Sequence, residues 1–433
     1  MLNLAVFFGG RTAEHDVSII TGTQFIENAD KQKYHIIPVY ISREGLWYTG
    51  EALADAKFYL HPDLSRKGIS RVWLSPEAGS RELMKKTALG VKAVERIDVA
   101  AIAMHGMHGE DGTLQGLFEL ADIPYTSAGV TGSSAGMDKI LSKAAFKGLG
   151  VPCLDAVYFE RSEYEASSED IVRRVEEAFS YPVIVKPANL GSSIGIKKAH
   201  DRAELLEALA LAASYDRRIL VEPAIEKLRE INCAVLGNGA EAQASLLEQP
   251  LSKGEILDFA DKYLPAQGGS KGMKSLDRIL PAELPEETEA EIKRYALEIF
   301  KGFDMKGVVR IDFMIDEATG KVYANEVNTI PGSFAFYLFE PAGLPYRQLI
   351  DRLVDRRQQA GAVRFFANRH RHLGSFVRQR NNLEICIRMD VHVIVKADLG
   401  IERRIRASGK HHRQRFIQRI HAHRRRAIAF CQQ

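Results

Sequence analysis

The segment Val308–Leu338 most constrains what this chain can fold into, because it holds two strand-forming runs joined by a turn. Val308–Ile315 and Val322–Val327 are rich in β-branched and aromatic residues, and Asp316–Gly320 is rich in turn-forming residues. Two such runs separated by a short polar turn predict an antiparallel hairpin.

Polar side chains occupy one face of each predicted strand. Because side chains alternate between the faces of a strand, Arg310 and Asp312 share a face of the first strand, and Glu326 and Asn328 share a face of the second. If the two polar faces coincide, two carboxylates, an amide oxygen and a guanidinium converge. Such a set suits Mg²⁺ and phosphoryl transfer from ATP. A solvated hairpin face explains these four residues equally well on their own.

The N-terminus reads as a βαβ unit. LNLAVFFGG predicts a buried strand, RTAEHDVSIITGTQFIENA a helix, and HIIPVYIS a second strand, so we expect a parallel sheet. Parallel sheets bind ligands at the carboxyl ends of their strands. Glu14 follows the first strand. A third predicted strand, VAAIAMHG, has His105 near its end and runs into a loop with Glu110 and Asp111. Glu14 suits either a substrate ammonium or a helix start, where the dipole favours acidic residues, and His105 suits either a structural or a catalytic role.

Two lysine-bearing segments are candidates for phosphate binding. Lys139 lies at the start of a helical pattern, and Lys186 lies in YPVIVKPANLGSSIGIKKA, which predicts a strand, a Gly/Ser loop and a strand. Backbone N–H groups of such a loop, together with a lysine, bind phosphates. The Walker A pattern is absent. The loop is a weak signal alone, because many β-turns look similar.

The charge of the chain is unevenly distributed. Residues 356–433 hold 19 Lys and Arg against 4 Asp and Glu, whereas the rest of the chain holds 40 against 52. This change predicts a boundary just after Asp355, followed by an irregular, poorly ordered basic tail. Two explanations of the tail stay open: an appendage that binds nucleic acid or a surface, and translation out of frame.

The remaining composition is that of a globular cytoplasmic protein. The N-terminus has no basic region before its short apolar run, and no apolar run is long enough to span a membrane. The four cysteines lack metal-ligand spacing, so incidental thiols are expected.

The ordered motifs across residues 1–355 resemble those of the D-alanine–D-alanine ligases, a family of the ATP-grasp superfamily. The resemblance rests on GG-x-x-x-E-H-D-V-S, H-G-x-x-G-E-D-G-T-L-Q-G, G-M-D-K and E-V-N-T-x-P-G. It implies a multi-domain fold of the α/β and α+β classes with an ATP-grasp architecture. The implied domains are an N-terminal α/β domain with a parallel sheet (1–127), a central subdomain (128–222), a C-terminal subdomain with a lid loop and the metal hairpin (223–355), and the basic tail (356–433).

The resemblance also implies a reaction and its participants. ATP would phosphorylate the carboxylate of a first D-alanine, and the amine of a second D-alanine would displace phosphate, giving D-alanyl-D-alanine for peptidoglycan precursors. Two Mg²⁺ or Mn²⁺ ions and a homodimer are implied, with Asp312, Glu326 and Asn328 matching the metal ligands. The matching nucleotide-binding residues are Lys139, Lys186, Glu222, Glu230 and Lys262.

The substrate positions follow from the same motifs. Glu14 would hold the ammonium of the first D-alanine and His105 its carboxylate, while Ser192 and Tyr263 would tie this end of the site to the lid. The remaining matches are Arg310 and the Gly332 N–H, which would stabilise charge at the acyl carbon, and Tyr337 and Leu338, which would hold the acceptor carboxylate.

Two departures from the family pattern concern the acceptor. Tyr337 stands where a serine is frequent, and Phe259 replaces a lid tyrosine. D-Lactate and D-serine are therefore the alternative acceptors. Nucleic-acid binding through the tail is the alternative outside enzyme chemistry.

Overall fold

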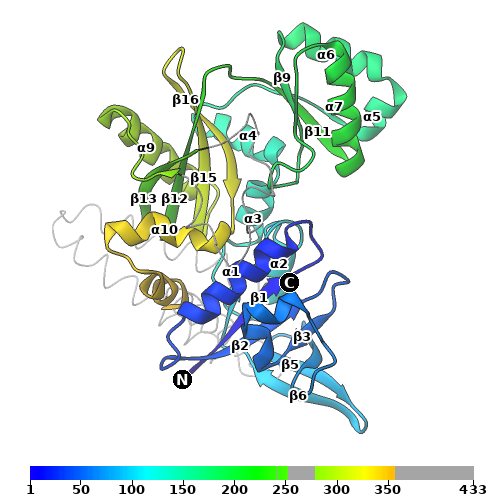
Figure 1. The fold of residues 1–433 in the computed structure, drawn as a ribbon, viewed down its shortest axis with the longest axis vertical. Coiled ribbons are helices and arrows are strands. Elements are labelled where there is room, and N and C mark those ends of the chain that lie inside the picture. Colours follow the sequence, from blue (N-terminus) through cyan, green and yellow to red (C-terminus); the bar gives the residue numbers. More distant parts are fainter. Residues whose placement is uncertain (240, 252–277, 356–433) are drawn as a thin grey trace, which may run out of the picture. The chain divides into compact units, whose positions relative to one another are not determined.

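The computed structural model describes residues 1–239, 241–251 and 278–355. The chain divides into two units, Met1–Gly361 and Ala362–Gln433, and the second lies outside the described residues. Within the first unit, the described residues form three β-sheets, each packed against helices (Figure 1). None of the described helices is both long enough and apolar enough to cross a membrane.

The first sheet is built around the predicted βαβ unit. Strand β1 (Leu2–Gly9) pairs in parallel with β2 and β7, which confirms the predicted parallel sheet for these three strands. Helix α1 (His15–Asn28) connects β1 to β2 and packs against β1. The sheet then continues through four antiparallel strands that the sequence did not predict, so the whole sheet is mixed. Its other strands are β2 (Tyr34–Ile41), β3 (Trp47–Thr49), β4 (Ser70–Leu74), β5 (Glu82–Thr87), β6 (Gly90–Arg96) and β7 (Val99–Ile102).

Short helical elements lie within the first sheet's connections and after its last strand. Two 3₁₀ turns, η1 (Glu51–Ala54) and η2 (Ala56–Leu60), precede β4. Helix α2 (Thr113–Leu120) follows β7, and α3 (Val130–Met137) and α4 (Lys139–Gly148) follow α2.

The second sheet is antiparallel, in the order β10-β9-β11-β8. The Gly/Ser loop joins β9 to β10, as predicted. Helices α6 and α7 supply the apolar partners of this sheet (Figure 1), with Val172, Leu205 and Leu209 among its fully buried residues. The elements are β8 (Val157–Glu160), α5 (Arg161–Ala166), α6 (Ser168–Ala178), β9 (Val183–Pro187), β10 (Lys197–Ala199), α7 (Arg202–Tyr215) and β11 (Arg218–Pro223).

The third sheet contains the predicted hairpin. Strands β15 (Lys306–Asp316) and β16 (Lys321–Asn328) are antiparallel, and β15 also pairs with β12. Ile311 and Phe313 pack against α9 in one core, so Arg310 and Asp312 point to the opposite face. The other elements are β12 (Leu228–Asn238), β13 (Glu241–Pro250), β14 (Arg278–Ile279) and α9 (Glu286–Gly302).

The chain after the hairpin returns to the first sheet. The turn η4 (Gly332–Ala335) places Phe334 against Phe25 of α1, with ring centroids 5.1 Å apart. The chain continues through α10 (Phe336–Phe339) and η5 (Glu340–Ala342) to a helix over residues 346–355. Asp351 in that helix accepts hydrogen bonds from Lys33 Nζ (2.6 Å) and Tyr34 Oη (2.8 Å). The metal hairpin is thus anchored to the N-terminal core on its C-terminal side.

Candidate active site

The hairpin brings its four predicted polar residues together. Arg310 pairs with Asn328 in the strand register and Asp312 with Glu326, so their side chains share one face. Asp312 accepts two hydrogen bonds from Arg310, at 2.6 and 2.7 Å, and one from Asn328 Nδ2 at 2.9 Å. Burial opposes the charge on Arg310, yet Asp312 raises the pKa of Arg310 well above its ordinary value. The guanidinium is therefore a fixed cation beside the carboxylates.

The side-chain oxygens on this face of the hairpin fit a magnesium ion. No three His, Cys, Asp or Glu side chains of the described residues cluster closely enough to hold a metal by themselves. The amide of Asn328 completes the set, since Asp312 and Glu326 supply carboxylates on the adjacent strands. Mg²⁺ prefers hard oxygen ligands and retains several waters, so a few protein oxygens suffice.

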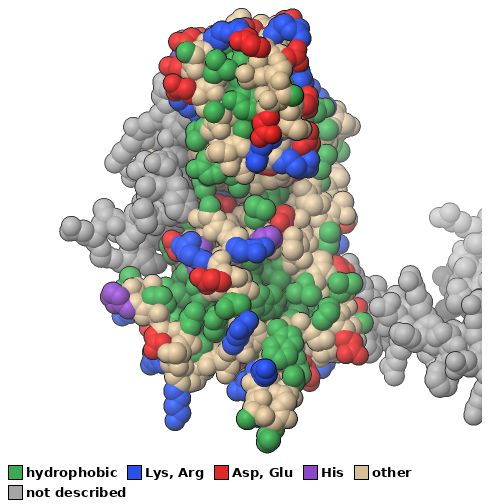
Figure 2. All heavy atoms as spheres, turned by 90° about the vertical axis from the view of Figure 1, so that its right-hand side faces the viewer, with side chains coloured by type: hydrophobic (Ala, Val, Ile, Leu, Met, Phe, Trp, Pro, Cys, Tyr) green, Lys and Arg blue, Asp and Glu red, His purple; other side chains and the backbone are tan. Residues whose placement is uncertain are grey.

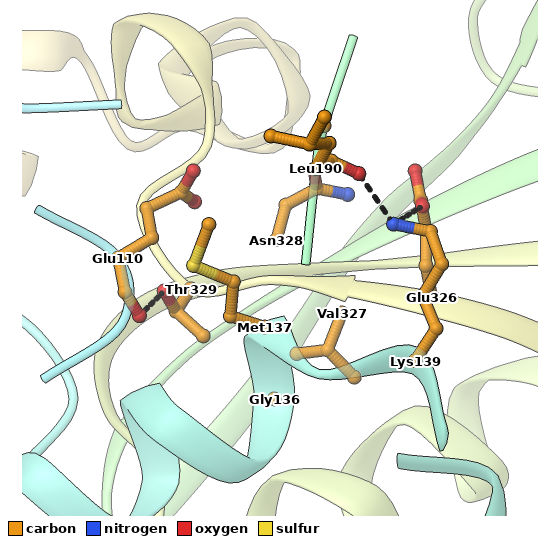
Figure 3. Close-up of a pocket in the computed structure, with 10 residues that line it drawn as sticks. Glu110, Gly136, Met137, Lys139, Leu190, Glu326, Val327, Asn328 and Thr329 are labelled. Atoms are coloured by element: carbon orange, nitrogen blue, oxygen red, sulfur yellow. Dashed lines mark hydrogen bonds and ion pairs between the residues drawn. The ribbon is translucent and has the colours of Figure 1, made fainter. Parts of the chain in front are cut away.

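Lys139 extends this face from the start of α4. Its Nζ lies 3.4 Å from Glu326 Oε2 and donates to the Leu190 carbonyl at 2.6 Å, and Figure 3 shows the three groups meeting at one side of a pocket. Asp138 fixes the start of the helix, because its side chain accepts from the N–H groups of Ile140 and Leu141. Arg218 of β11 donates to the other carboxylate oxygen of Asp138. The cap and this ion pair hold Lys139 in place.

The pocket has an empty volume of about 340 Å³, part of which is open to solvent. Backbone or side chains of the hairpin, the α3–α4 junction, the Gly/Ser loop and the loop after β7 all contribute to its wall. The lining residues are Glu110, Gly136, Met137, Lys139, Leu190, Gly191, Glu326, Val327, Asn328 and Thr329.

A buried cluster of charges lies behind the phosphate-binding candidates. Glu222 is 2% exposed and accepts from Lys186 Nζ and Lys143 Nζ, each at 2.9 Å. Burial would raise the pKa of Glu222, but the two ammonium groups lower it below its ordinary value. Lys186 also donates to Asn325 Oδ1 at 3.2 Å. Glu222 therefore fixes the position of Lys186.

Glu14 meets the Gly/Ser loop. Glu14 is 8% exposed at the start of α1, and the Ser192 hydroxyl donates to Glu14 Oε1. A Cβ at Gly191 would lie 3.1 Å from Glu14 Oε2, and one at Gly106 would lie 2.7 Å from it. Glycine at both positions therefore makes room for the carboxylate.

His105 is buried and neutral. Its Nε2 lies 2.7 Å from Thr21 Oγ1, and the ring also hydrogen-bonds to the backbone of Ile330. Burial lowers the pKa of His105 to about 4. At neutral pH the His105 ring therefore carries one N–H and no positive charge, and both of its nitrogens are engaged, by Thr21 and by the backbone of Ile330.

Glu110 is a further carboxyl group at the pocket, and it is half-buried. It accepts from the N–H groups of Gly106 (2.8 Å) and Ile330 (3.0 Å). Burial and then the charge of Glu14 raise the pKa of Glu110 to about 8. The sequence placed Glu110 in a strand-end loop without giving it a role.

The raised pKa of Glu110 makes the stability of the fold depend on pH. Between pH 4.5, the ordinary value for a glutamate, and pH 8, Glu110 binds a proton in the fold and loses it on unfolding. The free energy of unfolding should therefore fall as pH rises through this window. In Glu110→Gln, which keeps an acceptor oxygen, the fall between pH 5.5 and 8 should be smaller by on the order of 2–3 kcal/mol. Urea unfolding at both pH values measures this difference. Equal pH dependence in the two proteins would contradict it.

The remaining described residues of the prediction lie in two places, and the lid residues lie outside the described part of the chain. Gly332, Tyr337 and Leu338 are buried beyond the hairpin, and Tyr337 Oη donates to Glu248 Oε1 at 3.0 Å. Glu230 lies on β12 opposite Met314 of β15. The predicted lid residues Lys262, Tyr263 and Phe259 lie outside the described residues.

Comparisons with known proteins point to one family along most of the chain. Residues 3–128 match the family model described as D-ala D-ala ligase N-terminus, and residues 145–355 match D-ala D-ala ligase C-terminus. The D-alanine–D-alanine ligase of Acetivibrio thermocellus is 42% identical over 81% of this chain and 94% of its own. That of Caldicellulosiruptor bescii is 40% identical over 84% and 98%.

Solved structures give the same result. The D-alanine–D-alanine ligase from Coxiella burnetii has a TM-score of 0.71 and 27% identity, covering 86% of this chain and 99% of its own. The VanG D-Ala:D-Ser ligase from Enterococcus faecalis has a TM-score of 0.68 and 29% identity, covering 82% and 98%.

Proposed function

Because this chain belongs to the D-alanine–D-alanine ligase family, we propose that the pocket lined by Lys139, Glu326 and Asn328 is where it joins two D-alanines. The chain is an ATP-dependent ligase, and its product is D-alanyl-D-alanine, used in cell-wall synthesis. One observation carries the assignment of the site. Asp312, Glu326, Asn328 and Arg310 converge on one face of the hairpin, next to Lys139.

The chemistry needs two steps. A carboxylate oxygen of the donor D-alanine attacks the γ-phosphorus of ATP, and the bond to ADP breaks. The acceptor amine, after losing a proton, then attacks the acyl carbon, and phosphate leaves with its new oxygen. Both steps develop negative charge, so preorganised cations and N–H donors lower their barriers.

We assign the phosphates of ATP to the lysines. Lys139 donates to the Leu190 carbonyl at the Gly/Ser loop, and Lys186 lies near the end of β9, which leads into that loop. Backbone N–H groups of the loop would supply further donors. Glu222 and Glu230 are proposed for the adenine and ribose end. Magnesium, held by Asp312, Glu326 and Asn328, would offset the charge of the transferring phosphoryl group.

We assign the amino acids to the opposite side of the pocket. Glu14, positioned by Ser192, would pair with the donor ammonium, and neutral His105 would bind its carboxylate by exchanging the ring's hydrogen bond to Ile330 for one to the substrate. Arg310 and the Gly332 N–H would meet charge at the acyl carbon. Leu338 and Tyr337 form the proposed acceptor side.

A panel of acceptors tests the proposed function. Phosphate release should require ATP and D-alanine together, and D-alanyl-D-alanine should form faster than D-alanyl-D-serine or D-alanyl-D-lactate at equal acceptor concentration. Comparing amine and hydroxy-acid acceptors across pH separates the ligase types, because D-lactate has no ammonium to deprotonate. Faster formation of either alternative product would overturn D-alanine as the acceptor.

The proposed reaction needs nothing from residues 356–433, which lie outside the described residues. A stop codon after Asp355 keeps the Lys33–Asp351 ion pair, so kcat and KM should change by less than about twofold. Loss of most activity in a folded truncated protein would contradict this.

Nucleic-acid binding, if present, should come from the same tail. On the face drawn in Figure 2, described basic side chains are interspersed with acidic and apolar ones. Salt-sensitive RNA binding should therefore disappear on truncation. We further infer that the chain works as a homodimer in the cytoplasm, where ATP is available.

A further inference from the structure

A row of polar residues continues from the metal hairpin across the third sheet. Glu326 is paired with Asp312, Asp312 with Asn232 of β12, and Asn232 with Glu248 of β13. Directly paired residues of neighbouring strands point to the same side of a sheet. Glu248 therefore lies on the same face as the proposed metal ligands, two strands or roughly 10 Å from Asp312.

Glu248 is the centre of a buried polar cluster. It is 3% exposed, and it accepts from Tyr337 Oη (3.0 Å), Asn232 Nδ2 (3.0 Å) and Arg278 Nη1 (2.9 Å). The cluster joins β12, β13 and β14 to the segment that follows Gly332. A charged carboxylate with three donors is well satisfied at this depth.

Arg278 is held in one orientation by two different contacts. Besides the ion pair with Glu248, its guanidinium carbon lies 4.1 Å from the centroid of the Tyr337 ring. A guanidinium over an aromatic face gains a cation–π interaction. The side chain of Arg278 is 10% exposed, so most of it is buried in the cluster and a small part stays accessible.

The direction of the hydrogen bond from Tyr337 to Glu248 argues against the proposed contact between Tyr337 and the substrate carboxylate. Its hydroxyl proton goes to Glu248, an anion, so the same proton is not donated to a substrate carboxylate. The cation of this cluster is Arg278. Asp312, which accepts from Arg310, pairs across the strands with Asn232 of this cluster, so the cluster lies beside the polar face of the hairpin.

We propose that Arg278 binds the carboxylate of the acceptor amino acid, with Glu248 and Tyr337 as the residues that position it. This inference rests on the proposed function and assigns the acceptor subsite. An amino acid bound this way would direct its carboxylate towards β14 and its amine towards Arg310. Arg278 would then select acceptors by the negative charge of their carboxyl end.

The test compares D-alanine with D-alaninamide, which lacks that charge, as acceptors. The ratio of kcat/KM for D-alanine to that for D-alaninamide should fall by about 10- to 100-fold in Arg278→Gln, the loss expected for a charge-assisted hydrogen bond. Arg278→Lys should recover part of the ratio because it keeps the charge. The KM values for ATP and for the donor D-alanine should stay within about twofold in both variants.

Two further variants separate binding from folding. Arg278→Gln leaves the Glu248 carboxylate buried without its cation, so Glu248→Gln/Arg278→Gln neutralises both, and it should lose the same acceptor preference. Arg229→Gln is the matched control. Arg229 is on β12 next to Glu230, so it points to the other face, and it contacts Gln249 and Glu283. In Arg229→Gln, the ratio of kcat/KM for D-alanine to that for D-alaninamide should equal the ratio in the parent.

Tyr337→Phe tests the positioning role. Loss of the hydrogen bond to Glu248 should raise the KM for acceptor D-alanine by roughly 5- to 20-fold, with kcat less affected. An unchanged acceptor KM would remove Tyr337 from the subsite.

The outcomes distinguish this inference from the proposed function. A parent protein that makes no dipeptide would overturn both. A parent that makes D-alanyl-D-alanine, together with a folded Arg278→Gln or double variant that keeps the full preference for D-alanine over D-alaninamide, would overturn the inference alone.

Discussion

Replacing Glu326 with glutamine is expected to lower kcat by about 10³-fold or more while the protein stays folded. The side chain is 28% exposed at the pocket, so it contributes charge and a metal-binding oxygen and little core volume. Glutamine keeps the shape and removes the charge. Electrostatic stabilisation at a phosphoryl-transfer site supplies several kcal/mol, and ~4 kcal/mol corresponds to this change in rate. The measurement is kcat at saturating Mg²⁺ and ATP, with a thermal melt of the same preparation.

Glu317 offers a control in the same hairpin. It lies exposed in the turn between β15 and β16, so Glu317→Gln should leave kcat and the melting temperature unchanged. A folded Glu326→Gln protein with activity within tenfold of the parent would refute the role assigned to this carboxylate.

Glu222→Ala is expected to lower the free energy of unfolding by ~3–5 kcal/mol. Glu222 is the shared partner of Lys143 and Lys186, all three are buried, and alanine leaves two ammonium groups without their anion. Removal of one partner from a buried ion pair costs this amount because the remaining charge is poorly solvated. Urea unfolding of parent and variant at pH 7 gives the difference.

Glu207 provides the exposed counterpart. It pairs with Lys197 at 2.6 Å, but its side chain is 70% exposed, so Glu207→Ala should change stability little. If Glu222→Ala were no more destabilising than Glu207→Ala, the buried cluster would not be the stabilising element described above.

Short-range patterns predicted the hairpin and the N-terminal parallel strands well. Alternation along β15 is a local property, and it correctly placed Arg310 and Asp312 on one face and Ile311 on the other. Strands β3 to β6 were not predicted, because β3 has only three residues and β6 is largely exposed, so neither has a clear apolar period.

Contacts between distant segments were the least predictable part of the site. Lys143 is not among the predicted site residues, and its pairing with Glu222 depends on how α4 packs near β11. Glu248 and Arg278 belong to no motif, and only the register of β12, β13 and β14 brings them onto the functional face. To predict such residues from sequence alone, one would first need to know the strand register.

The most direct test of the central claim follows the carboxylate oxygens of the donor. The purified chain is given ATP, Mg²⁺ and D-alanine labelled with ¹⁸O in both carboxylate oxygens, and the dipeptide and phosphate are analysed by mass spectrometry. Phosphorylation of the carboxylate followed by displacement transfers one donor oxygen to phosphate for each peptide bond formed. We therefore predict D-alanyl-D-alanine and phosphate in equal amounts, with one ¹⁸O in each phosphate. Dipeptide formed with unlabelled phosphate, or ATP hydrolysis without dipeptide, would contradict the assignment.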